Sequence, residues 1–375
     1  MTSPCLRPVA GTPREVLALL HQWLSTAGPV GPAVVRTSGS SGRPKDVVLS
    51  REALVASADA THNRLGGPGQ WLLDLPAHYV AGLQVLVRSV LAGTDPVIAG
   101  DHPTLLDAIG AMTTPRRYVS LVPTQLHRIA RAGALGILAD LDAVLIGGAS
   151  LAPDLADSAR AAGVPVVRTY GMSETAGGCV YDGLPLDGVQ VRIDDAGIVH
   201  LAGPMLFDGY RNDAAATARV LRDGWFTTDD LGELTGGGRL RILGRGDDVV
   251  ISGGVNVSLP AVTDALAGLA GVREAMAVGV GDPEWGTRVV ACIVPGGGPA
   301  PLLDLLRDGV EEAGLPRTWA PRSVLHVDAF PLLENGKVDR QALRALAASP
   351  PARPLSLTFG PRSAESGPKR QAQDG

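Results

Sequence analysis

Residues 37–45 read Thr37-Ser38-Gly39-Ser40-Ser41-Gly42-Arg43-Pro44-Lys45 and follow the short apolar run Ala33-Val34-Val35. Hydroxyls, two glycines and a lysine suit a phosphate, because glycine allows close backbone approach and successive N–H groups then converge on an anion. The run is not the common nucleoside-triphosphatase loop, since Pro44 precedes the lysine and Asp46-Val47-Val48-Leu49 is typical of a strand. Taken alone, the run also fits a flexible Ser/Gly connector.

The composition of the whole chain limits its class. Its 375 residues are enough for two or more domains, and 45% hydrophobic residues provide for a large buried core. The formal net charge of -5 and the scattered Lys and Arg residues argue against a basic face for nucleic acid. We therefore expect no nucleic-acid partner.

The sequence has no pattern typical of a membrane or secreted protein. The longest apolar region, 133–152, contains two aspartates and two adjacent glycines, so it suits a buried sheet segment better than a membrane span. The first residues, Met1-Thr2-Ser3-Pro4, lack the basic and apolar regions of a secretory signal. We expect a cytoplasmic protein with reduced thiols, since its cysteines are few and widely spaced: Cys5, Cys179 and Cys292.

Apolar periodicity predicts an α/β fold for the first half of the chain. Residues 14–27 have the spacing of an amphipathic helix, and Ser50 is a suitable N-cap for a helix that runs to about Leu65. Strands then alternate with segments of helical length, which indicates a mainly parallel sheet covered on both faces. The expected strands are 71–75, 95–98, 118–122, 143–146 and 164–167.

The pattern changes near residue 189. Short alternating runs predict an antiparallel β subdomain at about 189–243. A compact α+β unit is expected next, with helices at 259–269 and 301–313 and strands at 274–280, 288–294 and 323–327. We therefore expect a large domain, 1–246, and a small C-terminal domain, 247–348. Residues 349–375, rich in Pro, Ser, Arg and Gly, are expected to form a disordered tail.

Four further motifs follow the first loop in order. Thr169-Tyr170-Gly171-Met172-Ser173-Glu174-Thr175 sits at the carboxyl end of a predicted strand, where ligands bind in open α/β sheets. The other motifs are Gly224-Trp225-Phe226-Thr227-Thr228-Asp229-Asp230-Leu231-Gly232, residues 244–256, and Asn335-Gly336-Lys337-Val338-Asp339-Arg340. In this order the set resembles the adenylate-forming superfamily of acyl- and aryl-CoA synthetases, luciferases and peptide-synthetase adenylation domains, over most of residues 33–345.

The resemblance implies a two-step reaction. The family joins a carboxylic acid to ATP, which gives an acyl-adenylate and pyrophosphate, and then usually transfers the acyl group to the thiol of coenzyme A. Glu174 would coordinate Mg²⁺, a cation that prefers carboxylate and phosphate oxygens. The β- and γ-phosphates would bind the first loop through Thr37, Ser38, Gly39, Ser40, Ser41, Gly42 and Lys45.

The resemblance also places the nucleoside of ATP. Tyr170 would stack on the adenine, although it also fits an ordinary core aromatic. Asp230 would accept hydrogen bonds from both ribose hydroxyls, and Arg245 would help to hold the sugar. The Gly147-Gly148-Ala149 backbone would line the other face of the adenine, and the ATP site would include Gly148, Gly171 and Ser173.

The small domain would serve both steps. Lys337 would stabilise charge between the carboxylate oxygen and the α-phosphate, although alone it also fits a solvated loop lysine. The mobile domain would then turn about a hinge at Asp247 and present Ser252-Gly253-Gly254, which helps to form the thiol tunnel. Glu174 and Arg245 complete the implied catalytic set.

The chain departs from the family pattern at a few positions. It has Asp229 where the family usually has glycine and Asn335 where the family usually has serine, which puts the local loop geometry in doubt. Only 36 residues precede the phosphate loop, whereas family members commonly have many more. We therefore expect part of the large domain to be missing or reduced.

One stretch bears on the identity of the acid: Leu75-Pro76-Ala77-His78-Tyr79-Val80-Ala81-Gly82-Leu83-Gln84-Val85-Leu86-Val87-Arg88. With Ile146-Gly147-Gly148-Ala149 and Ile251-Ser252-Gly253-Gly254, it is most similar to the o-succinylbenzoate–CoA ligases of menaquinone biosynthesis. Their aromatic acid has two carboxylates. Arg88 would bind the carboxylate that does not react, and His78 would lie over the reacting one. Alternatively, Arg88 lies on a helix surface and His78 is structural.

Other functions are compatible with these motifs. Another aryl- or acyl-CoA ligase, or a stand-alone adenylation enzyme, would share them. A catalytically inactive nucleotide-binding regulator would keep the fold, but the presence of Glu174, Asp230, Arg245 and Lys337 argues against it. The sequence does not fix the oligomeric state and is compatible with a homodimer.

Overall fold

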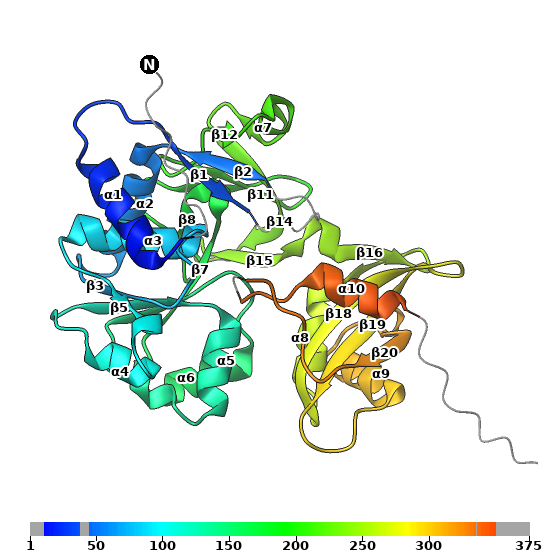
Figure 1. The fold of residues 1–375 in the computed structure, drawn as a ribbon. Coiled ribbons are helices and arrows are strands. Elements are labelled where there is room, and N and C mark those ends of the chain that lie inside the picture. Colours follow the sequence, from blue (N-terminus) through cyan, green and yellow to red (C-terminus); the bar gives the residue numbers. More distant parts are fainter. Residues whose placement is uncertain (1–10, 38–44, 335, 350–375) are drawn as a thin grey trace, which may run out of the picture.

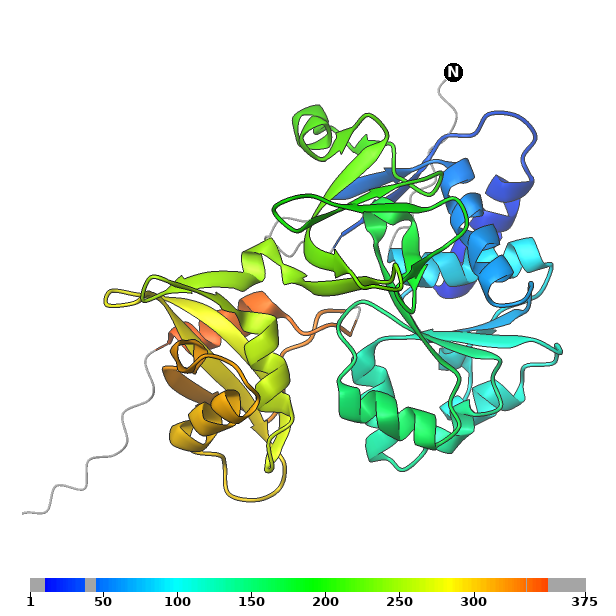
Figure 2. The same ribbon diagram turned by 180° about the vertical axis from the view of Figure 1, so that it is seen from behind.

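The protein folds into a large and a small body that lie side by side (Figure 1; Figure 2 shows the reverse side). The computed structural model describes residues 11–37, 45–334 and 336–349, without the side chain of Asp247. The large body ends with a long antiparallel pair of strands, and η4 (Gly246–Asp248) leads from it into the small body. Residues 350–375 of the expected disordered tail, 349–375, lie outside the described residues, as do Cys5 and Asn335.

A seven-stranded sheet forms the centre of the large body. Its strand order is β4-β3-β5-β6-β7-β8-β9, and the first five strands are parallel, which confirms the mainly parallel sheet. The last two strands pair antiparallel at one edge. The strands are β3 (Gln70–Leu73), β4 (Val97–Ile98), β5 (Arg117–Leu121), β6 (Ala143–Ile146), β7 (Val166–Met172), β8 (Gly177–Tyr181) and β9 (Leu184–Pro185).

Helices cover both faces of this sheet (Figure 1). One core cluster joins one face to α1, α2 and α3, and another joins the opposite face to α4, α5 and α6. The predicted N-cap is confirmed, because the Ser50 side chain accepts a hydrogen bond from the N–H of Ala53. The helices are α1 (Pro13–Ser25), α2 (Arg51–Arg64), α3 (Val80–Ala92), α4 (Leu105–Gly110), α5 (Pro123–Arg131) and α6 (Pro153–Ala161).

Two antiparallel sheets complete the large body. The first loop joins β1 to β2, and β12 pairs with β2, while the predicted β subdomain forms a five-stranded sheet. The motif at 169–175 covers the carboxyl end of β7 and the following η3 (Ser173–Thr175), so it lies at the end of a strand as expected. The strands are β1 (Ala33–Arg36), β2 (Asp46–Leu49), β10 (Gln190–Ile193), β11 (Ile198–Ala202), β12 (Gly209–Tyr210), β13 (Leu221–Arg222), β14 (Trp225–Leu234) and β15 (Leu240–Arg245), with α7 (Ala214–Val220) before β13.

The small body is an α+β unit with its own core. Five strands form one sheet, and apolar side chains of α8 and α9 pack against strands of that sheet. The β16–β17 hairpin and the last helix, α10, were not expected from the sequence. The elements are β16 (Val249–Ser252), β17 (Val255–Ser258), α8 (Leu259–Ala267), β18 (Val272–Asp282), β19 (Gly286–Pro295), α9 (Leu303–Glu312), β20 (Ser323–His326) and α10 (Arg340–Ala348).

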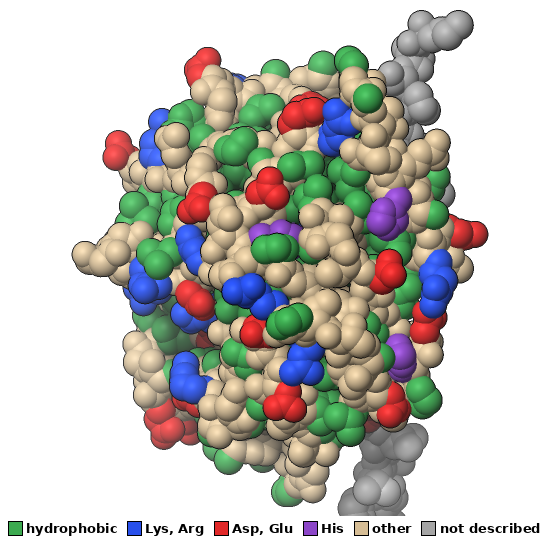
Figure 3. Space-filling view, turned by 90° about the vertical axis from the view of Figure 1, so that its left-hand side faces the viewer, with side chains coloured by type: hydrophobic (Ala, Val, Ile, Leu, Met, Phe, Trp, Pro, Cys, Tyr) green, Lys and Arg blue, Asp and Glu red, His purple; other side chains and the backbone are tan. Residues whose placement is uncertain are grey.

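The surface and the thiols agree with the composition. Lys and Arg side chains are mixed with Asp and Glu over the face in Figure 3. Among the described residues, no helix is both long and apolar enough to cross a lipid bilayer. Cys179 and Cys292 are buried free thiols, and burial raises the pKa of each to about 12.

Adjacent leucines in α9 test the core of the small body. Leu306 is 0% exposed, whereas Leu305 is 52% exposed. We expect Leu306→Ala to lower the free energy of unfolding by about 2–5 kcal/mol, because it leaves a cavity. The control Leu305→Ala should change it by less than about 0.5 kcal/mol. Chemical denaturation measures both, and equal costs would contradict the described packing.

Candidate active site

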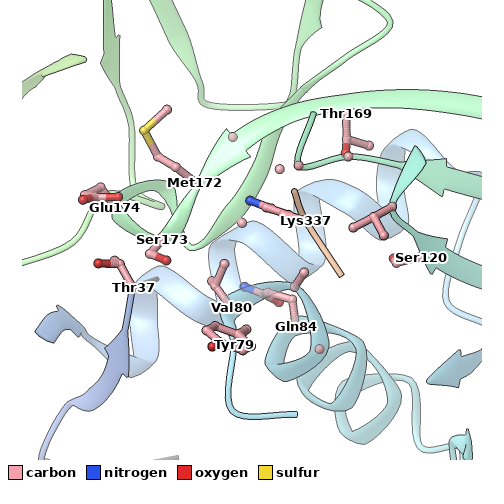
Figure 4. A pocket seen from close by; sticks show the side chains of 18 of the residues that line it. Thr37, Tyr79, Val80, Gln84, Ser120, Thr169, Met172, Ser173, Glu174 and Lys337 are labelled. Carbon is pink, nitrogen blue, oxygen red and sulfur yellow. The ribbon is translucent and has the colours of Figure 1, made fainter. Parts of the chain in front are cut away.

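Both bodies contribute to the wall of one cavity. Its volume is about 520 Å³, and small-molecule sites have roughly 300–1,000 Å³. The large body contributes the ends of β1 and β2, the start of α3, and segments around β5, β7, η3 and β14. Figure 4 shows Lys337 of the small body between Thr37, Ser173 and Glu174 on one side and Thr169 on the other.

A tight hairpin carries Lys337 into the cavity. The N–H of Leu333 donates to the carbonyl of Lys337 at 2.8 Å, and the N–H of Gly336 donates to the carbonyl of Leu333 at 2.9 Å. Gly148 gives the lysine room, because a Cβ there would lie 2.7 Å from Lys337 Cε. Burial, followed by the charge of Arg245, lowers the pKa of Lys337.

Asp230 and Arg245 lie opposite each other on β14 and β15. Asp230 is 8% exposed, and its Oδ2 accepts a hydrogen bond from the Tyr170 hydroxyl at 2.7 Å. Arg245 Nη2 lies 3.0 Å from Asp229 Oδ2. Burial and the charge of Asp230 raise the pKa of Tyr170, which keeps its hydroxyl protonated as a donor. The departure at position 229 thus gives Arg245 a carboxylate partner.

The base of the first loop forms part of the cavity wall. The N–H of Thr37 donates to the Lys45 carbonyl at 2.8 Å, and the N–H of Lys45 donates to Thr37 Oγ1 at 3.1 Å. The predicted phosphate contacts of Ser38, Gly39, Ser40, Ser41 and Gly42 lie outside the described residues. The structure therefore fixes where the loop begins and ends.

Glu174 lies beside this loop base on the cavity wall. Its Oε1 accepts a hydrogen bond from the Tyr210 hydroxyl at 2.9 Å, and Lys45 Nζ lies 4.5 Å from the centre of the Tyr210 ring. The described residues contain no group of three or more His, Cys, Asp or Glu that could hold a metal ion. Mg²⁺ commonly takes one or two carboxylates and completes its shell with water and phosphates, so a lone Glu174 fits it.

A buried cation lies at the α3 end of the cavity. Arg88 lines the cavity but is only 3% exposed, and its Nε has no hydrogen-bond partner. Its guanidinium lies 4.9 Å from the centre of a Trp71 ring. Burial lowers the pKa of Arg88, and the polar group that opposes this effect is Tyr181 rather than any carboxylate of the described residues. The positive charge is therefore not neutralised by a described acidic side chain.

The groups around Arg88 are neutral. Gln84 lies one turn earlier on α3 and also lines the cavity. Its Nε2 donates to the Ala176 carbonyl at 2.8 Å, while its Oε1 is buried without a partner. Burial, and then the charge of Arg88, lowers the pKa of His62 to about 4, so this imidazole stays uncharged at neutral pH. This end of the cavity thus suits an anionic group.

Comparison with known proteins agrees with this geometry. The sequence model of the AMP-binding enzyme family matches residues 33–210, and that of the AMP-binding enzyme C-terminal domain matches residues 261–337. The chain belongs to the AMP-binding enzyme family. The adenylate-forming resemblance and the α/β fold class are therefore confirmed.

Relatives within the family cover most of the chain. The probable 2-succinylbenzoate–CoA ligase of Mycobacterium tuberculosis (strain ATCC 25618 / H37Rv) is 48% identical over 83% of each chain. The o-succinylbenzoate CoA synthetase of Bacillus subtilis, solved with the acyl-adenylate intermediate OSB-AMP, is 27% identical with a TM-score of 0.73 over 83% of this chain and 68% of its own. ATP-bound MatB from Rhodopseudomonas palustris is 26% identical with a TM-score of 0.75, over 84% and 68%.

Two residues that the resemblance places in contact with substrate do not themselves line the cavity. Neither His78 nor Tyr170 is among the described residues that line the cavity. His78 Nε2 lies 3.5 Å from Glu334 Oε1 of the small body, and its ring stacks on Tyr79 with centres 4.5 Å apart. Their contacts with substrate remain predictions.

The expected coenzyme A face lies in the β16–β17 hairpin, which does not line the cavity in the described part of the chain. Ser252 is buried, and its hydroxyl has no hydrogen-bond partner. Gly253 has φ +57, and a Cβ there would lie 2.7 Å from the Trp285 ring, so the turn needs glycine. The role of this face in thiol transfer stays a prediction.

Gln84 and Tyr210 are among the residues of the site that were not expected from the sequence. Gln84 was detectable, because it precedes Arg88 by four residues and therefore lies on the same helix face. Tyr210 gave no comparable signal. It reaches Glu174 because β12 pairs with β2, and this pairing joins distant parts of the chain.

The lysines of the chain allow a direct titration. The sequence contains only Lys45, Lys337 and Lys369. After ¹³C-dimethylation, we expect the NMR signal assigned by Lys337→Arg to titrate below the ordinary lysine pKa of about 10.4, because burial disfavours the charged amine. Lys337 should therefore lose its charge as the pH rises before an ordinary lysine does. Titration at the ordinary value would mean that the amine is solvated.

Proposed function

We propose that the chain is an AMP-forming 2-succinylbenzoate–CoA ligase. The observation that carries this proposal is Arg88, a 3% exposed guanidinium on the cavity wall without a carboxylate partner among the described residues. A buried charge is costly unless it is paired, so this position favours a substrate with an anion away from its reacting carboxylate. The acid named for the relatives has that chemistry, with two carboxylates on one aromatic keto acid.

The nucleotide would occupy the opposite part of the cavity. Thr37 and Lys45 would place the first loop on the β- and γ-phosphates. Asp230 and Arg245 would hold the ribose, and the Tyr170 hydroxyl would orient the Asp230 carboxylate while the ring serves the adenine. This placement is supported because Tyr170 on β7, Asp230 on β14 and Arg245 on β15 lie next to one another.

Adenylation would take place beside Lys337. A carboxylate oxygen of the acid attacks the α-phosphate, and pyrophosphate leaves with the electrons of the broken P–O bond. The Lys337 ammonium would stabilise the charge that develops on the attacking and phosphate oxygens. Because the lysine is partly desolvated, its charge interacts more strongly there than in water.

Glu174 would hold Mg²⁺, which when bound partly neutralises the charge of the phosphates. The chain's own part is to keep the carboxylate in place. The Tyr210 hydroxyl donates a hydrogen bond to Glu174 Oε1. Burial raises the pKa of Tyr210, so the phenol stays protonated and remains a donor. The orientation of Glu174 is thus fixed before a ligand binds.

In the second step the thiol of coenzyme A would attack the acyl carbon, and AMP would leave. We propose that the small domain turns at Asp247 for this step and brings the Ser252-Gly253-Gly254 face to the adenylate. The product would serve menaquinone biosynthesis in the cytoplasm.

A panel of acids in ATP–pyrophosphate exchange tests the proposal. 2-Succinylbenzoate should support the fastest exchange. Faster exchange with another acid would identify a different ligase, and no exchange with any acid would indicate a regulator.

Arg88→Ala tests the acid pocket. We expect the apparent affinity for 2-succinylbenzoate to fall about ten- to a hundredfold, because a charge-assisted pair in a partly buried site contributes roughly 1.5–3 kcal/mol. ATP affinity should be unchanged, and so should any pyrophosphate exchange that benzoate supports, because benzoate lacks the second carboxylate. The exposed Arg131→Ala is the matched control. Unaltered kinetics for the dicarboxylic acid in Arg88→Ala would refute this pocket.

Asp247→Pro tests the hinge. Residue 247 lies in η4, between Arg245 and β16. Proline fixes φ near -65°, so we expect it to hold the small domain in the adenylating arrangement. Adenylate should form at a near-normal rate, while transfer to coenzyme A from a supplied adenylate should be lost. A folded variant that makes thioester at the wild-type rate would exclude the hinge.

A further inference from the structure

The hairpin that carries Lys337 is hydrogen-bonded to the large domain at the residue before the lysine. The Thr124 hydroxyl donates to the carbonyl of Gly336 at 2.9 Å. That carbonyl belongs to the peptide group that joins Gly336 to Lys337. The contact therefore acts on the backbone of the lysine itself, across the boundary between the two domains.

The start of α5, which carries Thr124, is fixed by hydrogen bonds of its own. Thr124 is the second residue of α5, which begins with Pro123 at its first position. The next residue, Gln125, accepts from the N–H of Val122 at 2.9 Å and donates to the Asp74 carbonyl at 2.7 Å. These bonds tie the start of α5 to the segment after β3. Thr124 therefore lies in a segment of the large domain that these hydrogen bonds hold in place.

The hairpin that carries Lys337 also packs closely against the start of α5. Gly336 has φ +78, the left-handed region that favours glycine, and a Cβ there would lie 3.4 Å from Val122 Cγ2. The hairpin therefore lies close against the residue before α5. On the other side of the lysine, Gly148 leaves room for its side chain. Backbone and side chain of Lys337 are both positioned by the large domain.

A second contact joins the same hairpin to the large domain. Glu334 Oε1 lies 3.5 Å from His78 Nε2, but the Glu334 side chain is 67% exposed. Exposed ion pairs usually contribute little, because water screens them. The hydrogen bond of Thr124 is partly buried, so it is the stronger candidate for holding the hairpin.

We propose that Thr124 is a positioning residue that holds Lys337 for adenylation and releases it for thiol transfer. Among the residues that the structure describes, Thr124 is not part of the cavity wall, so its effect must pass through the hairpin. A rotation of the small domain would break the bond, and Thr124 therefore serves the first step alone. This inference rests on the adenylating role proposed above for Lys337.

Thr124→Val removes the donor and keeps the shape of the side chain. We expect the single-turnover rate of adenylate formation to fall about three- to tenfold, the effect of one hydrogen bond, with unchanged KM for ATP and acid. Thioester formation from supplied adenylate should keep its rate or become faster. Thr124→Ser should restore adenylation. The control Thr26→Val removes a hydroxyl that donates to a carbonyl within α1 and should change neither step.

A double-mutant cycle separates positioning from general damage. In a Lys337→Ala background, Thr124→Val should have no further effect on the residual adenylation, because the lysine side chain is already gone. A loss of equal size in both backgrounds, a raised KM for ATP, or equal losses in both half-reactions would overturn the proposal. The proposed function itself would instead be refuted if the wild-type enzyme formed no adenylate, or if Lys337→Ala formed adenylate at the wild-type rate.

Discussion

The burial of positive charge within one cavity is the constraint on which this site depends. Removing a cation from water is unfavourable, so the rest of the folded structure must offset the cost of burying it. The ring of Trp71 and the neutral Gln84 and His62 surround Arg88 without neutralising it. At the interdomain end, Lys337 is desolvated beside Arg245. The protein thus keeps two buried cations in one cavity, an electrostatic cost that the proposed anionic ligands would relieve.

The two-domain architecture allows Lys337 to be buried here and, as proposed, to leave the cavity with the small domain. A lysine on a core strand would be fixed for both steps, whereas a hairpin seated on the start of α5 carries it as part of a separate domain. Asp230 and Arg245, the proposed ribose contacts, lie on β14 and β15 of the large domain, so a turn of the small domain would leave them in place. The adenylate would therefore keep its binding site between the two proposed steps.

The sequence was informative where local pattern determines structure. Alternating apolar runs predicted the sheets, and the resemblance singled out Lys337, Glu174 and Arg88, which the structure brings to one cavity. It failed where partners are distant or patterns are weak. The bond between Tyr170 and Asp230 joins residues sixty positions apart, and a sequence does not name the partner of a phenol. The β16–β17 hairpin was missed because two adjacent glycines interrupt short strands.

The order of the cavity's parts along the chain has a consequence for biosynthesis. The wall begins at Thr37 and is completed by Lys337, whereas the large domain ends at about residue 246. The lysine follows 337 − 246 = 91 residues later, which takes roughly 5–20 s at common rates of translation. During that interval the nascent chain carries Asp230 and Arg245 without Lys337. With the proposed roles of these residues, a ribosome-bound chain would meet ATP before it is able to activate an acid.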